Sequence, residues 1–480
     1  MVILLAGLVG LSGCMTVGPD YKPPHTATPA HWATPLQTGV TSAAAEAELL
    51  AQWWTVFNDP VLTRLIEQAR TNNWDLRQAE ARVREARAQR GLAKAALFPT
   101  VVANASASRT TSSKETGPGL TSDFYAAALD ASWELDLFGG KRRALEAATA
   151  SWAAAEESLR DVQVSLLAEV AMNYVEVRSY QQLLSITESN VATRTETYAI
   201  TRWRHEAGLT TQLDVDQARL SLEQARAQIP TLRTSLEQAK YRLAVLLGLP
   251  PGALNDLLAQ PRPVPCASAE VAVGLPADLL RRRPDVRAAE RKLAAQTAQI
   301  GVAKAARYPN FSLVGSIGLE SLAFPNLFST SARAAQGAAK AAWTLFDGGS
   351  IRQNILVQTA RQEEALSAYE AAVLTALKDV ENALVAFANE QTRRATLAEA
   401  VKSAQSAFEL ARDQYVSGLV SFQSVLDTQQ ALLNAQEQLA ASEAQVTSSL
   451  ISLYKALGGG WRAGETIPAT AQETISQTIR

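Results

Sequence analysis

Hydrophobic and polar positions follow two different rhythms along this chain of 480 residues. Beyond Gly140, apolar side chains recur every three or four residues, at Leu145, Ala148, Trp152, Ala155, Leu159, Val162 and Leu166. This spacing is typical of a coiled-coil seam. No glycine or proline interrupts this stretch before Gly208, and a second such stretch runs from Ile351 to Ser417. At 1.5 Å per residue, each stretch predicts a helix about 100 Å long.

Glycines mark where the predicted long helices end. Gly208 and Gly418 follow them, and each is followed by another 39 residues without glycine, up to Gly248 and Gly458. A glycine just past a helix is a common stop signal, because its backbone accepts the left-handed conformation. We therefore expect two antiparallel helical hairpins, at about 141–247 and 350–457, with Gly208 and Gly418 at their tips.

The second rhythm has a period of two and lies between the helical stretches. Apolar and mostly polar side chains alternate through about 100–136 and again through about 310–346, where Trp343 and Leu345 close the last alternation. This predicts four strands, each near the nine to eleven residues that cross an outer membrane. Four strands cannot close a barrel, so strands in a membrane would have to share one with other chains. Two soluble hairpins packed on a core are the alternative.

The chain is an internal duplication with an offset of 210. The stretch "DLRQAEARVREARAQRGLAKAALFP" (75–99) is echoed by "DVRAAERKLAAQTAQIGVAKAARYP" (285–309), and Trp133 pairs with Trp343. Such a fixed period indicates two copies of one unit. We expect a first repeat at 51–248, a proline-rich linker with Cys266 at 249–276, a second repeat at 277–458 and a tail at 459–480. The predicted fold is α+β and mainly α.

The N-terminal residues have the pattern of a targeting segment. Val2 to Gly13 carry no charge and end in small residues, which predicts a signal peptide at 1–13. Leu11-Ser12-Gly13-Cys14 resembles a bacterial lipobox, and this implies a mature protein that begins at an acylated Cys14. Met15 in place of aspartate then directs it to the outer membrane. Prolines predict an extended tether at 14–50. An ordinary buried thiol at Cys14 is the alternative.

Composition excludes several classes of function. The net charge is −2, which gives no reason to expect a nucleic-acid partner. We find no catalytic or phosphate-binding motif, and three histidines with two distant cysteines support neither a metal site nor a cofactor. No apolar run reaches the eighteen or so residues of a transmembrane helix. We therefore expect no enzyme.

Four longer motifs resemble one known family. They are "VGPDYKPP" (17–24), "WWTVFNDPVLTRLIEQARTNNWDLRQAEARVREA" (53–86), "LPADLLRRRPDVRAAERKLAA" (275–295) and "IGVAKAARYPNFSL" (300–313). They are similar to the TolC-like outer-membrane factors, specifically the OprM/NodT-type efflux lipoproteins. The resemblance implies a homotrimer with a twelve-stranded outer-membrane β-barrel and a periplasmic α-barrel. It also implies two partners, a periplasmic adaptor (membrane fusion protein) and an inner-membrane transporter of the RND type.

The resemblance further implies a periplasmic gate near the two helical turns. The positions involved are Asp214, Tyr415, Leu419, Val420, Ser424 and Asp427. TolC's gate arginine falls on Val420 and its second ring aspartate on Ser424, so the closing network must differ here. We expect closure through an Asp214–Tyr415 hydrogen bond, through apolar contacts of Leu419 and Val420 or through other residues. We also expect a cation-attracting ring at Asp427. Solvated polar positions near helix ends are the alternative for both carboxylates.

Three functional classes remain after these observations. An outer-membrane export duct for small molecules explains the duplication, the four strands and the lipobox together. A periplasmic coiled-coil adaptor lipoprotein would explain the hairpins and the lipobox, but neither the duplication nor the strands. An enzyme would need a site that no motif indicates. We therefore expect an export duct at the outer membrane that extends into the periplasm.

Overall fold

The computed structural model describes residues 16–26, 28–35, 40–41, 43, 46–267 and 271–462. The predicted signal peptide, Cys14 and residues 463–480 lie outside the described residues. The chain divides into two compact units. The first contains Ala81–Glu157, Val286–Ala372 and the described part of Met1–Thr26; the second contains Ser158–Asp285 and the described parts of Ala27–Glu80 and Val373–Arg480. Each unit is described by itself below.

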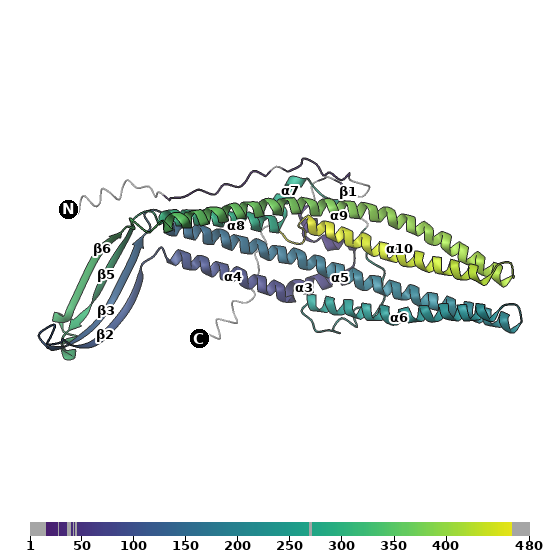
Figure 1. Ribbon diagram of the computed structural model, residues 1–480, viewed down its shortest axis with the longest axis horizontal. Coiled ribbons are helices and arrows are strands. Elements are labelled where there is room, and N and C mark those ends of the chain that lie inside the picture. The colour runs from purple at the N-terminus through teal and green to yellow at the C-terminus, as the bar shows by residue number, and fades with distance from the viewer. Residues whose placement is uncertain are drawn as a thin grey trace. The chain divides into compact units, whose positions relative to one another are not determined.

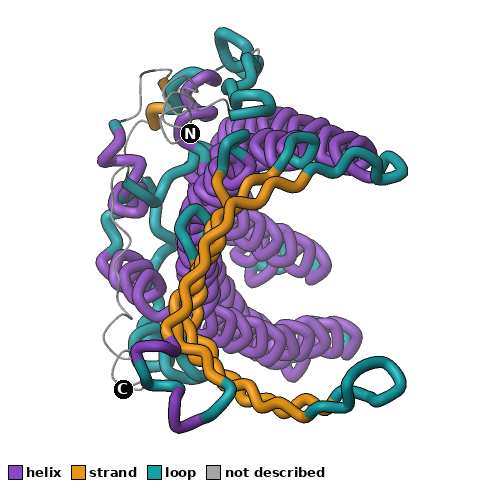
Figure 2. The backbone as a smooth tube through the Cα atoms, turned by 90° about the vertical axis from the view of Figure 1, so that its left-hand side faces the viewer, coloured by secondary structure: helices purple, strands orange, loops and turns teal. Residues whose placement is uncertain are grey.

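A four-stranded antiparallel sheet forms much of the first unit. Its strands are β2 (Thr100–Thr111), β3 (Thr121–Leu135), β5 (Asn310–Ser321) and β6 (Arg333–Ala342), in the order β2-β3-β5-β6. The register places Leu129 opposite both Ala103 and Ile317, so the apolar positions of neighbouring strands share one face. The sheet is strongly curved (Figure 2).

The fourth strand ends earlier than expected. The expectation extended the alternation through Trp343 and Leu345, but β6 ends at Ala342. The indole of Trp343 instead donates to the carbonyl of Arg307 at 3.0 Å, just as Trp133 donates to the carbonyl of Leu97 at 2.9 Å. A few residues on, the Asp347 carboxylate accepts from the backbone N–H of Ile351 at 2.6 Å and begins the next helix. These contacts replace ladder pairing after Ala342.

Four long helices make the two predicted hairpins (Figure 1). The long arms are α5 (Gly140–Glu206) and α9 (Ser350–Val416), with 67 residues each, and the return arms are α6 (Gln212–Leu246) and α10 (Phe422–Ala456), with 35 residues each. The bounds of the two hairpins differ by 210 throughout. The same offset relates α4 (Trp74–Ala95) to α8 (Pro284–Ala305). The prediction of a mainly helical, duplicated chain with four antiparallel strands is confirmed.

Shorter elements complete the described residues. They are β1 (Val40–Thr41), α2 (Ala47–Ala51), η1 (Trp53–Phe57), α3 (Pro60–Asn72), β4 (Val271–Ala272), α7 (Pro276–Arg282), η2 (Phe324–Asn326) and η3 (Thr330–Ala332). In the second unit, Trp53 stacks on Tyr454 of α10, with ring centroids 5.6 Å apart. Asp59 caps α3 by accepting the backbone N–H of Val61 at 2.8 Å. The Trp53–Tyr454 stack attaches η1 to the second hairpin. None of the described helices combines the length and hydropathy needed to cross a membrane.

Candidate functional site

Both hairpins of the second unit turn through the same backbone motif. Gly208 and Gly418 each have φ = +75°, which glycine adopts without the strain that a side chain would bring. The N–H of Leu209 donates to the carbonyl of Arg204 at 2.8 Å, and that of Leu419 donates to the carbonyl of Gln414 at 2.9 Å. This is the Schellman ending of a helix, in which the glycine allows otherwise unpaired carbonyls to be satisfied. The chain therefore reverses at the two positions expected from the sequence.

A capping box begins the first return helix, α6. The Thr211 hydroxyl accepts the backbone N–H of Asp214 at 3.3 Å, and the Asp214 carboxylate accepts the N–H of Thr211 at 3.2 Å. The hydroxyls of Thr210 and Thr211 also donate to Asp214. Partial burial alone would raise the pKa of Asp214, but these hydrogen bonds outweigh it and hold the pKa below its ordinary value. Asp214 thus fixes the start of α6.

The second return helix, α10, begins without such a box. Ser421 is its N-cap and makes no side-chain capping bond. Ser424 occupies the position equivalent to Asp214, and its hydroxyl lies 3.5 Å from that of Ser421, at the limit of hydrogen bonding. The start of α10 is held instead by packing, because Phe422 and Val425 are buried.

An apolar cluster joins the two hairpins just behind their turns. We call it the turn cluster; its buried members are Ala218, Phe408, Tyr415, Phe422, Val425 and Leu432. Ala218 comes from α6, whereas the other five come from α9 and α10. The rings of Tyr415 and Phe422 lie 5.4 Å apart, and Val420 packs against the cluster from the turn. Burial of these side chains favours contact between the hairpins.

Arg204 of α5 reaches across to the second turn. Its guanidinium lies 4.8 Å from the centre of the Tyr415 ring, and one of its nitrogens donates to the carbonyl of Val416 at 2.7 Å. A cation over an aromatic face and a charged hydrogen bond to a helix C-terminus are both favourable. Arg204 was not among the residues predicted from the sequence. Its position one turn before Gly208 was visible, but its contacts lie more than 200 residues away in the chain.

The expected Asp214–Tyr415 hydrogen bond is not formed within the chain. Asp214 is bonded to Thr210 and Thr211, and the buried Tyr415 hydroxyl has no hydrogen-bond partner among the described residues. The Nε of Arg204 is likewise buried and unpartnered among the residues that the structure covers. In the single chain, the contact between the turns therefore runs through Arg204 and not through Asp214.

Two of the expected gate residues project away from the turn cluster. Leu419 is 75% exposed at the tip of its hairpin. Asp427 is exposed on α10, where its carboxylate accepts the Gln423 side-chain amide at 2.7 Å. Asp216 on α6 is also exposed and accepts the Gln212 amide at 3.1 Å. The two hairpins thus carry similar exposed carboxylates, at positions that differ by one residue between the repeats.

A second contact between the hairpins lies further from the turns. Arg194 of α5 is only 5% exposed, and it donates to the side-chain oxygen of Gln430 on α10 at 2.9 Å. It also donates to the carbonyl of Ser221 on α6 at 2.9 Å and to Asn190 at 2.6 Å. Burial lowers the pKa of Arg194, partly offset by the Glu437 carboxylate. This buried cation joins three helices and has no direct ion pair among the described residues.

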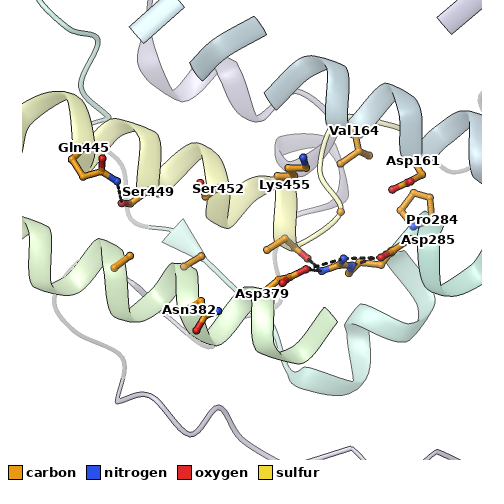
Figure 3. Close-up of a pocket in the computed structure, with 15 residues that line it drawn as sticks. Asp161, Val164, Pro284, Asp285, Asp379, Asn382, Gln445, Ser449, Ser452 and Lys455 are labelled. Atoms are coloured by element: carbon orange, nitrogen blue, oxygen red, sulfur yellow. Dashed lines mark hydrogen bonds and ion pairs between the residues drawn. The ribbon is translucent and has the colours of Figure 1, made fainter. Parts of the chain in front are cut away.

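A polar pocket of about 420 Å³ lies within the second unit, between α9 and α10 (Figure 3). Arg283 lines it and pairs with Asp285 at 2.7 Å and with Asp379 at 3.2 Å. It also contacts the carbonyl of Ala456 at the end of α10, at 3.4 Å. Arg283 therefore makes local salt bridges at the start of α8. Among the described residues, no group of three or more histidine, cysteine or carboxylate side chains could hold a metal ion.

Family comparison agrees with this duplicated architecture. The model of the family described as outer membrane efflux protein matches residues 65–249 and 275–459. The chain belongs to this family. The two matched segments are offset by 210, so each repeat of the chain is one copy of the family's domain. The resemblance to TolC-like factors of the OprM/NodT type is confirmed.

Individual relatives cover nearly the whole chain. The solvent efflux pump outer membrane protein SrpC of Pseudomonas putida is 34% identical over 464 residues, which is 95% of this chain and 98% of the relative. Nodulation protein T of Rhizobium leguminosarum bv. trifolii is 34% identical over 94% of this chain and 95% of its own length. Among solved structures, the outer-membrane channel OprN has a TM-score of 0.88 at 36% identity, with 93% of this chain and 100% of OprN covered. This outer membrane efflux protein is therefore a non-enzymatic channel of an efflux pump. The alternative of a periplasmic adaptor is wrong.

Proposed function

We propose that the protein works as a homotrimer whose three copies close one twelve-stranded barrel in the outer membrane. The observation that carries this proposal is the open four-stranded sheet, in which β2 and β6 are the edges within the described residues. An edge exposed to lipid leaves backbone groups unpaired at several kcal/mol each. Single-chain barrels begin at eight strands, so four strands need partners. Three copies supply twelve strands, as the family resemblance implies.

Cell fractionation followed by unheated electrophoresis of the detergent-extracted protein tests this assembly. The proposal expects an outer-membrane species with the mass of three chains, which dissociates to one chain on boiling. A monomer after gentle extraction, or a species of two chains, would contradict it. The 51.5 kDa chain makes these outcomes easy to separate.

Acylation of Cys14 is the second part of the proposal. Its support is the apolar run that ends in Leu11-Ser12-Gly13-Cys14. The barrel already spans the membrane, so the acyl chains would assist assembly more than they retain the folded trimer. Cys14→Ser should abolish labelling by a clickable fatty acid, with Cys266→Ser as the control that keeps it. Labelling that persists in Cys14→Ser rejects the lipid site.

The periplasmic entrance is closed where the hairpin turns of the three copies meet. The Arg204–Tyr415 contact supports this proposal, since it holds the turns of each copy together. Leu419 and Val420 supply apolar contacts at the tips. Asp214 fixes the start of α6, and the buried Phe422 and Val425 hold the start of α10 beside Ser424. Asp427 then occurs three times around one axis, and three carboxylates at a narrow neck concentrate negative potential.

Ion selectivity in planar bilayers tests the Asp427 ring. The wild-type trimer should be cation-selective and blocked by multivalent cations, and Asp427→Asn should weaken both effects. Asp216→Asn is the matched control, because this exposed carboxylate also accepts a bond from a glutamine four residues earlier. If Asp427→Asn changes nothing while Asp214→Asn does, the constriction lies on α6. If neither matters, Leu419 and Val420 form the gate.

A periplasmic adaptor and an inner-membrane RND transporter complete the proposed pump. Relatives are named for solvent efflux and for pyoverdine export, which supports small organic compounds as the exported class. A photoreactive residue in place of the exposed Leu419 tests the first partner. It should capture an adaptor in cells, whereas the same residue at the equally exposed Leu92 should not. If the residue at position 419 captures only neighbouring copies of this chain, the adaptor does not bind at the hairpin tips.

A further inference from the structure

Two loops at one end of the sheet occupy equivalent positions in the two repeats but differ in their side chains. Both connect neighbouring antiparallel strands, at residues 112–120 and 322–332, so they lie at the same end of the sheet (Figure 1). The first loop carries Lys114, Glu115 and two glycines. The second exposes three large apolar side chains, Leu322 at 71%, Phe324 at 58% and Phe328 at 75%, whereas the first exposes one, Leu120 at 68%.

The second loop bends toward the apolar face of the sheet. The Phe324 ring lies 5.5 Å from that of Tyr125 and 6.5 Å from that of Phe328. Tyr125 alternates in step with Leu129 and Trp133 on β3. The aromatic group therefore continues the apolar face of the sheet and lies apart from the face that carries Asp130.

Part of the backbone of this loop is paired by local hydrogen bonds. The N–H groups of Leu327, Ser329 and Ala332 donate to carbonyls three residues earlier, at 3.1 to 3.2 Å. The Ser321 hydroxyl also accepts the N–H of Ala323 at 3.1 Å. Each backbone group paired in this way avoids the cost of being unpaired at the lipid boundary, where headgroups and water can pair the others.

The spacing of aromatic side chains fits the thickness of an outer-membrane apolar band. Trp133 lies near one end of β3 and Tyr125 lies eight residues nearer the other. Eight residues of strand span about 26 Å, and at the tilt of about 40° of outer-membrane strands they rise about 20 Å, most of the band about 25 Å tall that aromatic girdles flank. Near Tyr125 on the same face, Arg109 and Asp123 form a paired charge at 2.6 Å. Such a pair is suited to the polar headgroup level.

We propose that the loop 322–332 is an interfacial anchor that lies in the outer leaflet, with Phe324 and Phe328 at the boundary between acyl chains and headgroups. Its occupant is membrane lipid. This inference rests on the proposed function, because it requires the sheet to be in the outer membrane. It also makes the two loops of each copy unequal, because the loop 322–332 would lie in lipid while the loop 112–120 would lie in water.

A fluorescent label read against two quenchers tests the anchor. A Cys266→Ser chain with Phe328→Cys is labelled with NBD and reconstituted in phosphatidylcholine bilayers that contain a nitroxide lipid labelled near the headgroup. The label should emit at shorter wavelength than in water, and the nitroxide lipid should quench it several-fold more than aqueous iodide does. Glu115→Cys on the first loop is the matched control and should show the reverse.

Leu313→Cys on the apolar face of β5 separates the two proposals. If the nitroxide lipid quenches the label at position 313 while iodide quenches the label at position 328, the barrel proposal still holds and the anchor proposal is wrong. Protection of 328 from both quenchers would also overturn it, because the loop would then be folded inward. Iodide quenching at 313 itself would reject the membrane barrel and the anchor together.

Discussion

The two hairpin turns have the same backbone conformation but differ in nearly every side chain that stabilises it. Gly208 and Gly418 have the same φ and the same Schellman bonds. The first turn is fixed by the polar capping box of Thr211 and Asp214, whereas the second is fixed by the buried rings of Tyr415 and Phe422. Duplication therefore kept the path of the chain, while the means of stabilising it diverged.

This divergence makes the two hairpins complementary. Arg194 and Arg204 extend from the first hairpin, and their counterparts at an offset of 210 are the uncharged Ala404 and Gln414. The second hairpin supplies what these cations contact: the Gln430 amide oxygen, the Val416 carbonyl and the Tyr415 ring. The difference between the repeats thus explains how they join.

Removal of Arg194 should have the largest effect on stability. Arg194→Ala leaves Gln430 and Asn190 without their buried donor, and we expect a loss of about 2–3 kcal/mol in the free energy of unfolding. Urea unfolding followed by circular dichroism measures it. Arg202→Ala removes an exposed pair with Glu206 at 3.5 Å on the same helix and should cost less than about 0.5 kcal/mol. Equal losses would show that the hairpins are not joined through Arg194.

The two turn glycines should respond equally to substitution. Gly208→Ala and Gly418→Ala each force a side chain into the left-handed region, at a cost of about 1–2 kcal/mol. An added Cβ meets nothing within 4 Å at Gly208 and only an Arg204 nitrogen at 3.9 Å at Gly418, so neither variant should clash. Unfolding midpoints that differ clearly between the variants would disprove the equivalence of the two backbones.

The caps should respond unequally. Thr211→Ala breaks the capping box of α6 and should cost about 1 kcal/mol. Ser421→Ala removes a hydroxyl that makes no capping bond and should cost only a few tenths of a kcal/mol. The same unfolding assay compares them, and a larger loss at Ser421 would reverse the assignment.

Acidification should weaken only the first cap. The pKa of Asp214 is depressed in the folded state by its hydrogen bonds, so its carboxylate stabilises the fold above the ordinary aspartate pKa of about 3.9. That contribution, about 0.5 kcal/mol for a largely solvated cap, is lost as the pH falls through the lower folded value. The difference between wild type and Asp214→Asn should therefore shrink below about pH 4. A constant difference would rule out this linkage.

Local patterns in the sequence predicted most of the fold. Helix periodicity and the glycines that end it located α5, α6, α9 and α10, and alternation located the four strands. The end of β6 was missed because Trp343 continues the alternation while its indole bonds to Arg307.

The contacts between the hairpins could not be predicted in the same way. Arg204 and Val416 are far apart in sequence, and no local rule pairs them. The family resemblance drew attention to Asp214 and Tyr415 instead. In this chain the former completes a cap, and the latter supports a cation from the other hairpin. The resemblance thus directed attention to the helical turns but did not predict the contacts that the turns make.

Single-channel conductance of Arg204→Ala tests the central claim most directly. If the Arg204–Tyr415 contact keeps the periplasmic entrance closed, this variant should remain trimeric and conduct several-fold more than wild type in planar bilayers. Arg204→Lys should be intermediate, because it keeps the charge over the ring without the planar guanidinium. Gln414→Ala, at the equivalent position of the second hairpin, should match wild type. A trimeric Arg204→Ala channel with unchanged conductance would contradict the claim.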